Sequence, residues 1–215
     1  MPLPVAHSLM GYTLAEATQV RLAGTAWRNV LLFAALANLP DIDFLPGFLM
    51  GQPNQYHHHL THSLGFAAFV GLLGCLIYWR RDRNFMRHAH APQNEIRFRF
   101  WPYFLTISVA VFSHCVLDLL TVDTSLPFGM LLFWPFDMGY YDMNVKIFES
   151  VHKSNASTTF FSSLLQWHNF KVMAIEVFIM VPVAGLVKIM QILRRSLARQ
   201  RNLAAEKCQQ RNLIY

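Results

Sequence analysis

The sequence YHHHLTHSLGFAAFVGLLGCLIYW, residues 56–79, places four histidines directly before a long apolar run. The run, residues 64–79, has the composition of a membrane helix, but such a helix needs about 20 apolar residues. We therefore expect the helix to begin earlier, near Leu60. Ionisable side chains are costly beside lipid and are seldom found there without a partner or a task. Since neutral imidazole is the commonest metal ligand in proteins, the stretch predicts either a metal site at the end of a membrane helix or a solvated histidine-rich turn.

The composition favours a membrane protein of one domain. The chain has 215 residues, of which 54% are hydrophobic and only 14% are charged. The net charge is +6, but the arginines flank apolar runs and no basic patch is interleaved with aromatic residues, so we expect no nucleic-acid partner. The three cysteines form neither a disulfide framework nor a CxxC pair. The first residues lack a basic leader, so insertion is expected to rely on internal apolar helices.

Two more long apolar segments, residues 101–120 and 171–193, are predicted to cross the membrane. Residues 5–20 and 29–39 are also apolar but too short to cross comfortably, and the turn-like segment 21–28 joins them. The sequence therefore predicts an all-α, polytopic membrane fold with three long transmembrane helices and a short N-terminal helical hairpin. Small residues in the first arm of the hairpin should permit close helix packing.

The distribution of charge predicts an orientation. Arginines gather in residues 80–99 and 194–215, whereas aspartates dominate residues 121–169. Because positively charged loops stay in the cytoplasm, we expect a multi-pass protein of the bacterial inner membrane with residues 121–169 facing the periplasm. Residues 40–55, 80–99 and 121–169 are expected to be loops. Residues 1–193 would form the membrane-embedded domain, and residues 194–215 a basic cytoplasmic tail that is a surface helix or is frayed.

This topology brings distant ligand-type side chains to one level. His62 lies at the outer end of the first long helix, and His114 and Asp118, four residues apart on one helix face, lie near the outer end of the second. Each arm of the hairpin is about 21 Å long at 1.5 Å per residue, so both of its ends return to the outer level. The candidate metal ligands are His7, Asp41, Asp43, His57, His62, His114 and Asp118.

Mixed imidazole and carboxylate ligands suit zinc, manganese or iron. Seven candidates exceed what one tetrahedral ion uses, so the sequence favours two divalent ions bridged by a carboxylate, or one ion whose ligands are supported by the remaining residues. Structural roles compete with this interpretation: His7 could be a satisfied buried histidine, and Asp41 and Asp43 could be cap and turn residues. His58 and His59 are interpreted as spare or supporting side chains.

Five short motifs resemble a known family over residues 7–137. They are Pro4-Val5-Ala6-His7, Leu39-Pro40-Asp41-Ile42-Asp43, Thr61-His62-Ser63-Leu64, His114-x2-Leu117-Asp118-x2-Thr121 and Leu131-Leu132-x2-Pro135-Phe136. Together they resemble the YdjM-like membrane-bound, metal-dependent hydrolases, which are described as inner-membrane proteins under LexA control in the DNA-damage (SOS) response. The family pattern His-Arg-Gly-x-Thr-His-Ser has His-His in place of Arg-Gly here, so the resemblance leaves open which of His57, His58 and His59 is a ligand.

We therefore expect an enzyme that hydrolyses an ester or phosphoester of a lipid-like substrate at the outer membrane–water interface. Asp41 or Asp118 would accept the proton of the attacking water, and no Gly-x-Ser-x-Gly elbow suggests a serine nucleophile. The main alternative is a metal-binding transporter or sensor without catalysis. A haem protein with His62 and His114 as axial ligands, or a purely structural membrane protein, are further alternatives. Membrane lipid is the expected partner, and the substrate, the metal and the oligomeric state are left open.

Overall fold

A computed structural model describes residues 1–18, 20–88, 93–124 and 128–212, with side chains outside 82–99 and 204–212. Within these residues every regular element is a helix, and β-structure is limited to the isolated bridges Thr121–Phe148 and Met130–Tyr141. The helices are α1 (Pro4–Ala17), α2 (Ala26–Ala37), η1 (Leu39–Asp43), α3 (Phe44–Leu49), η2 (Pro53–Tyr56), α4 (Leu64–His88), α5 (Gln93–Leu119), α6 (Ser157–Leu164) and α7 (Trp167–Asn212). The prediction of an all-α fold is confirmed.

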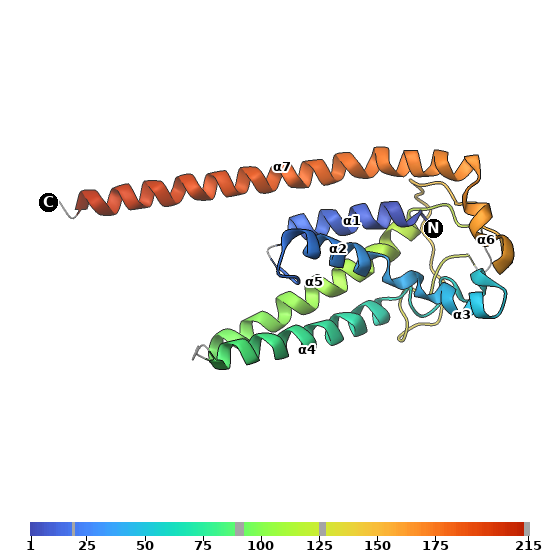
Figure 1. Cartoon of the computed structure of the whole chain (residues 1–215), viewed down its shortest axis with the longest axis horizontal. Helices are drawn as coiled ribbons and strands as arrows, with labels where there is room; N and C mark the ends of the chain where they lie inside the picture. The colour runs from blue at the N-terminus through green and yellow to red at the C-terminus, as the bar shows by residue number, and fades with distance from the viewer. Residues whose placement is uncertain (19, 89–92, 125–127, 213–215) are drawn as a thin grey trace.

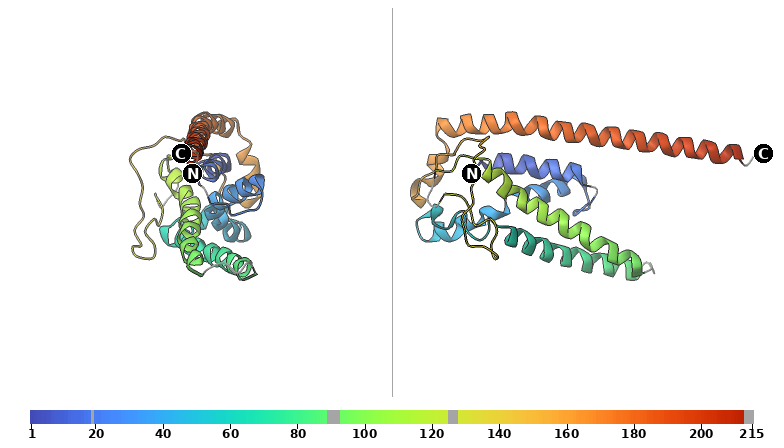
Figure 2. Two further views of the ribbon diagram at one scale, coloured as in Figure 1. Left: turned by 90° about the vertical axis from the view of Figure 1, so that its left-hand side faces the viewer. Right: turned by 180° about the vertical axis from the view of Figure 1, so that it is seen from behind.

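The long helices lie in layers with the N-terminal hairpin in the middle. Figure 1 shows α4 and α5 side by side below, α1 and α2 between them and α7, and α7 passing along α1 above. Seen from behind, the arrangement is the same, and α7 extends well past the other helices toward the C-terminus (Figure 2). The short helices α3 and α6 lie together at the opposite end, where the loops also gather.

Three helices contain segments long and apolar enough to cross a membrane: Leu64–Arg81, Phe100–Leu119 and Trp167–Leu203. Most of their residues are not buried inside the protein, and several large apolar side chains are exposed, including Ile77 at 65% and Phe178 at 81%. So much contiguous exposed apolar surface is unusual on a soluble protein and is expected where lipid is the surrounding medium. The prediction of three long helices with a short hairpin is confirmed. The hairpin's second arm and the helices after it form a bent pair, with 53° between Ala26–Ala37 and Leu39–Leu49.

The hairpin is held by close contact within it and by a polar anchor to α7. A β-carbon placed on Gly11 would come within 2.6 Å of the Phe33 carbonyl oxygen, so only glycine allows α1 and α2 to approach this closely. Phe33 is buried in a cluster with Ile107 of α5. The buried carboxylate of Glu176 accepts a hydrogen bond from the backbone N–H of Leu3 at 2.7 Å, which satisfies one donor at the start of α1.

The structure corrects the predicted start of the first membrane helix. It begins at Leu64 and not near Leu60, because Ser63 Oγ accepts a hydrogen bond from the backbone N–H of Phe66 at 3.0 Å and caps the first turn. Residues 80–99 were expected to be a loop, but α4 continues to His88 and α5 already begins at Gln93. The connection between these two helices lies outside the described residues.

Three other segments contain more helix than expected. Residues 40–55 were expected to be a loop, but they contain α3 and parts of η1 and η2. Pro40 and Pro53 each occupy the first turn of a short helix, where proline is tolerated. Residues 121–169 include α6. Residues 194–212 continue α7 without a break, so this part of the basic tail is neither a separate surface helix nor frayed.

Candidate metal centre

The seven ligand candidates named from the sequence come together at the α3–α6 end of the molecule, carried by α1, η1, the turn before α4, and α5. His7, His62 and His114 are completely buried, and the side chain of Asp41 is 17% exposed. Four groups of three side chains have ligand atoms within 4.8 Å of one another: His57, His58, His62; His7, His114, Asp118; Asp41, His62, His114; and Asp41, Asp43, His57. Each group can hold a metal ion.

The densest contacts join two histidines and two aspartates. His62 Nε2 lies 3.1 Å from His114 Nε2, 3.3 Å from Asp118 Oδ2 and 3.8 Å from Asp41 Oδ1. His114 Nε2 lies 3.3 Å from Asp118 Oδ2 and 3.4 Å from Asp41 Oδ1. Two ligand atoms on one tetrahedral zinc are about 3.3 Å apart, given zinc–nitrogen bonds of about 2.0–2.1 Å. These five distances therefore suit ligands of a shared ion.

Asp118 connects this group to a second one, which contains His7. While its Oδ2 faces His62 and His114, its Oδ1 lies 3.6 Å from His7 Nε2. The ring of His7 stacks on that of His114, with centroids 3.8 Å apart, so the two imidazoles lie face to face beside the same carboxylate. A carboxylate with its two oxygens directed at different ligand groups is suited to bridge two cations.

The other nitrogens of the two central histidines are already used. His114 Nδ1 lies 2.8 Å from the Ala37 carbonyl oxygen, and His62 Nδ1 lies 3.0 Å from Asp43 Oδ2. Because a carbonyl and a carboxylate oxygen both accept, each Nδ1 is assigned the proton, and each Nε2 then presents a lone pair. Two lone pairs facing each other across 3.1 Å repel unless a proton or a metal ion lies between them. A hydrogen bond from the second ring nitrogen to a carbonyl or carboxylate oxygen is the usual support of a metal-binding histidine.

Many polar atoms of the cluster are buried without a hydrogen bond from the described residues. They are both nitrogens of His7, Asp41 Oδ1, His57 Nε2, His58 Nε2 and both oxygens of Asp118. A buried polar atom without a partner costs about 1–3 kcal/mol, and more when it is charged. The residues present therefore fit a bound cation, which would satisfy these lone pairs at once.

Electrostatics keeps part of the cluster in the metal-binding form. Burial lowers the pKa of His57 well below its ordinary value, and neighbouring His58 lowers it further. Burial also lowers the pKa of His58. Burial opposes a charge on His62 as well, but the carboxylates of Asp43 and Asp118 outweigh it and raise the pKa of His62. Neutral His57 and His58 are ready to coordinate, because a metal binds only the deprotonated imidazole.

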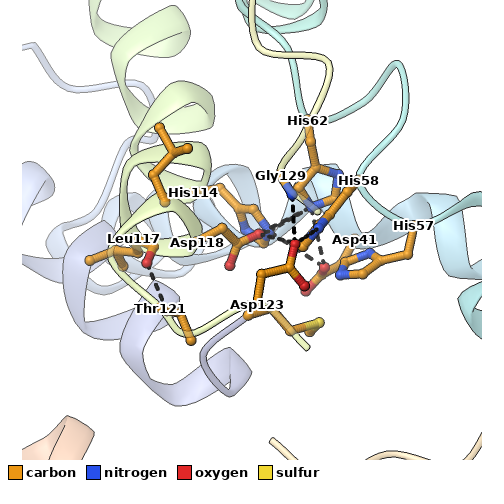
Figure 3. Close-up of polar contacts among 12 residues, drawn as sticks. Asp41, His57, His58, His62, His114, Leu117, Asp118, Thr121, Asp123 and Gly129 are labelled. Carbon is orange, nitrogen blue, oxygen red and sulfur yellow. Dashed lines mark hydrogen bonds and ion pairs between the residues drawn. The ribbon is translucent and has the colours of Figure 1, made fainter. Parts of the chain in front are cut away.

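His58 and Asp123 belong to the cluster although neither was among the seven candidate ligands named from the sequence. His58 has a φ of +67°, in the left-handed region, and this turn directs its ring inward. Its Nε2 lies 3.6 Å from Asp118 Oδ2 and its Nδ1 lies 3.7 Å from Asp123 Oδ2. Asp123 Oδ2 also accepts a hydrogen bond from the backbone N–H of Gly129 at 2.8 Å (Figure 3). Of the consecutive histidines, only His59 lies outside the groups, facing Tyr140.

The sequence also did not predict Lys153 near the cluster, because this residue lies in a segment without hydrophobic periodicity. Its ammonium lies over the ring of Phe44, 4.9 Å from the ring centroid, and Phe44 stacks on His57 with centroids 4.2 Å apart. Burial lowers the pKa of Lys153, while the carboxylates of Asp41 and Asp118 act in the opposite direction. No carboxylate of the described side chains lies within 4.0 Å of this ammonium. Lys153 is therefore a partly buried cation beside the cluster.

The sequence matches a family of known proteins over most of its length. The family model described as YdjM inner membrane protein matches residues 1–194. The chain belongs to this family. Searches of curated proteins and of solved structures gave no match. The resemblance predicted from the five motifs is confirmed, and the match takes in α1 to the apolar part of α7. YdjM membership identifies an inner membrane protein.

Proposed function

We propose that this YdjM-family protein is a zinc-dependent hydrolase that cleaves a phosphoester of a lipid-like substrate at the periplasmic face of the inner membrane. The observation that carries the proposal is the pair of Nε2 atoms of His62 and His114, 3.1 Å apart, between the carboxylates of Asp41 and Asp118. The directed lone pairs and the shared Asp118 support a two-ion centre. Imidazole with carboxylate is the ligand set of hydrolytic zinc sites.

The two central aspartates have different surroundings and therefore different proposed roles. Both oxygens of Asp118 face histidines, and its side chain is fully buried, so it acts as the bridging ligand. The side chain of Asp41 is 17% exposed, which makes it the carboxylate of this pair that a water molecule can reach. A bound zinc ion supplies Lewis acidity and lowers the pKa of a water toward 7. Asp41 then accepts the proton of the attacking water.

Lys153 supports a phosphoester over a neutral carboxyl ester. A partly buried ammonium that has no carboxylate of the described side chains within ion-pair distance is ready to bind an anionic group of a ligand. It also lines a cavity of about 430 Å³ together with Asn54, Thr124 and Ser163, next to Asp123 of the cluster. A polar cavity lined by a lysine suits the phosphate-bearing head of a lipid.

The periplasmic location rests on charge and on the level of the cluster. Arg80 and Arg81 lie at the end of the α4 span remote from His62, and Arg194 and Arg195 lie in the corresponding part of α7. Positively charged ends stay in the cytoplasm, so the cluster lies at the opposite, periplasmic end. Its position just beyond the start of the α4 span supports a substrate that stays in the membrane surface.

The test is elemental analysis followed by turnover measurements. Protein purified without a histidine tag, in lipid nanodiscs, is expected to retain zinc and to cleave a phosphodiester reporter in a chelator-sensitive manner. Phosphomonoester and carboxylester reporters are measured in parallel. Asp41→Asn should lose turnover while it retains most of the metal, because it removes a proton acceptor and keeps the bridging Asp118.

His59→Ala provides the matched control, because His59 lies in the same turn but outside the metal-holding groups. It should leave both metal content and turnover unchanged, whereas His62→Ala should abolish both. Metal binding without chelator-sensitive turnover of any reporter would reject the hydrolase. In that case metal flux into proteoliposomes would test whether the same ligands serve a transporter, and unchanged metal content in His62→Ala would reject the site itself.

A further inference from the structure

A second cavity, of about 500 Å³, lies at the end of the hairpin remote from the metal centre, between the last turn of α1, the α1–α2 connection and α7. Figure 1 shows this connection beside the middle of α7, away from α3 and α6. The cavity has one acidic and four basic side chains in its wall: Glu16, Arg21, Lys188, Arg194 and Arg195. Its lining is therefore strongly cationic.

The charge is not neutralised within the protein. Lys188 Nζ pairs with Glu16 Oε2 at 2.7 Å, which uses the single carboxylate of the wall. Among the described side chains no carboxylate lies within 4.0 Å of the guanidinium of Arg21, Arg194 or Arg195. Guanidinium groups are planar, carry several donors and match the oxygens of a phosphate better than an ammonium does. Three of them around one cavity favour an anionic phosphate group as the ligand.

The walls of the cavity are held in place by hydrogen bonds that do not involve the arginines. Gln191 Nε2 donates to the Ala17 carbonyl oxygen at 3.1 Å, which ties α7 to the end of α1. Asn29 Oδ1 accepts hydrogen bonds from the backbone N–H groups of Leu22 and Ala23 at 2.8 and 3.2 Å, which orders the connection that carries Arg21. The cavity therefore exists before a ligand binds, and little ordering is needed on binding.

The position of the cavity along α7 places it at the level of a membrane surface. Between Trp167 and Lys188, α7 rises by about 32 Å at 1.5 Å per residue, close to the hydrocarbon thickness of about 30 Å. Trp167 is 73% exposed at one end of this distance, and Trp27, beside the cavity, is 61% exposed at the other. Tryptophan is enriched at both membrane–water interfaces. Lys188 and the arginines that follow it therefore lie at the level of lipid headgroups.

We infer that this cavity binds the phosphate of an anionic phospholipid headgroup in the leaflet opposite the metal centre. Basic pockets between membrane helices on the cytoplasmic side bind such headgroups. The inference is independent of the hydrolase proposal, because none of the cavity's side chains belongs to the metal centre. The bound lipid would join α7 to the hairpin through the arginines on both sides.

The test compares two triple variants of the full chain that lose the same charge. Arg21→Gln/Arg194→Gln/Arg195→Gln removes the guanidinium groups of the cavity. The control, Arg28→Gln/Arg199→Gln/Arg201→Gln, removes three exposed arginines outside it. Binding is measured with phosphatidylglycerol, cardiolipin and phosphatidylcholine nanodiscs or vesicles, and with glycerol phosphate and inorganic phosphate as soluble probes. We expect the cavity variant to lose at least about tenfold in affinity for the anionic lipids, and the control less than about twofold.

Equal losses in the two variants would overturn the inference, since binding would then follow overall surface charge. Equal affinity of the native protein for phosphatidylcholine and for the anionic lipids would overturn it as well. Tight, arginine-dependent binding of inorganic phosphate without any preference for anionic lipid would reject a lipid as the ligand. A melting curve for each variant checks folding, and the single variant Arg194→Gln, at an exposed position on α7, replaces the triple variant if that one unfolds.

Discussion

Replacing Asp118 with asparagine should release metal from both ligand groups at once. The amide has nearly the shape of the carboxylate but lacks its charge and one of its acceptor oxygens. Asp118 Oδ2 is shared by His62 and His114 at 3.3 Å each, and Oδ1 faces His7 at 3.6 Å. The carboxylate of Asp118 therefore contacts His7 as well as the pair His62 and His114, so the variant affects both ligand groups.

The size of the effect follows from the number of ligands. Zinc bound by about four ligands gains about 10–16 kcal/mol, so one ligand contributes roughly 3 kcal/mol. Loss of Asp118 should therefore raise the Kd for zinc on the order of 100-fold, with a further contribution from the second group. At saturating metal the free energy of unfolding should fall by a similar roughly 3 kcal/mol, because the ion stabilises only the folded state.

Competition with chelators of graded affinity, followed by elemental analysis, measures the Kd directly, and a melting curve with and without zinc measures the linked stability. His59→Ala serves as the control and should behave as the native protein. If Asp118→Asn kept its full metal content against the same chelator, Asp118 would not be a ligand and the bridged arrangement would be refuted. If its melting temperature fell equally with and without zinc, the loss would be one of packing.

Other expectations rest on single contacts. Gly11→Ala should destabilise the protein by about 2–3 kcal/mol in thermal unfolding, because its β-carbon meets the Phe33 carbonyl, whereas Gly185→Ala in α7, with open space around it, should not. In metal-free protein, His57 should contribute a loss of stability as the pH falls below about 6.5, since an unfolded chain protonates His57 there and burial keeps the folded form neutral. The raised pKa of His62 acts in the opposite direction, so the contribution of His57 is read from the difference between two proteins. His57→Gln should flatten that slope in melting curves; an unchanged slope would contradict the burial argument. Lys153→Met should raise KM for an anionic phosphodiester about tenfold while leaving a neutral carboxylester unaffected, with Lys153→Arg restoring part of the loss. An equal effect on both reporters would remove Lys153 from substrate binding.

The sequence was sufficient to predict the long helices and the membrane level of the cluster, because both depend on the lengths of apolar segments. Sustained apolar runs predict membrane helices, and two hairpin arms of equal length return His7 and Asp41 to one end whatever their lateral packing. The four-residue spacing of His114 and Asp118 fixes a shared helix face. What these arguments leave undetermined is the sideways position of each helix, which side-chain packing such as that at Gly11 decides.

The residues that sequence reasoning missed depend on local backbone geometry or on unpatterned chain. His58 enters the cluster through a left-handed conformation, which is uncommon for a residue other than glycine. Lys153 and Asp123 lie in a segment whose path is set by isolated contacts, such as the bridge between Thr121 and Phe148. The start of α4 was misplaced because the apolar run 64–79 is shorter than the about 20 residues that crossing needs, so the helix was expected to begin near Leu60. The Ser63 cap instead starts it at Leu64. A Ser before an apolar run is a signal that could have placed this boundary.

The origin of the cluster's side chains in four separate segments sets a time order for synthesis. His7 leaves the ribosome more than a hundred residues before Asp118, and the carboxylate that joins the two groups is the last of the seven to emerge. Until α5 has been inserted and has turned this face toward α1, the groups that include His114 or Asp118 are incomplete. Completion of the bridged centre is therefore a late step of biogenesis, and under the proposed orientation its ions are drawn from the periplasmic pool, separate from the cytoplasm in which translation takes place.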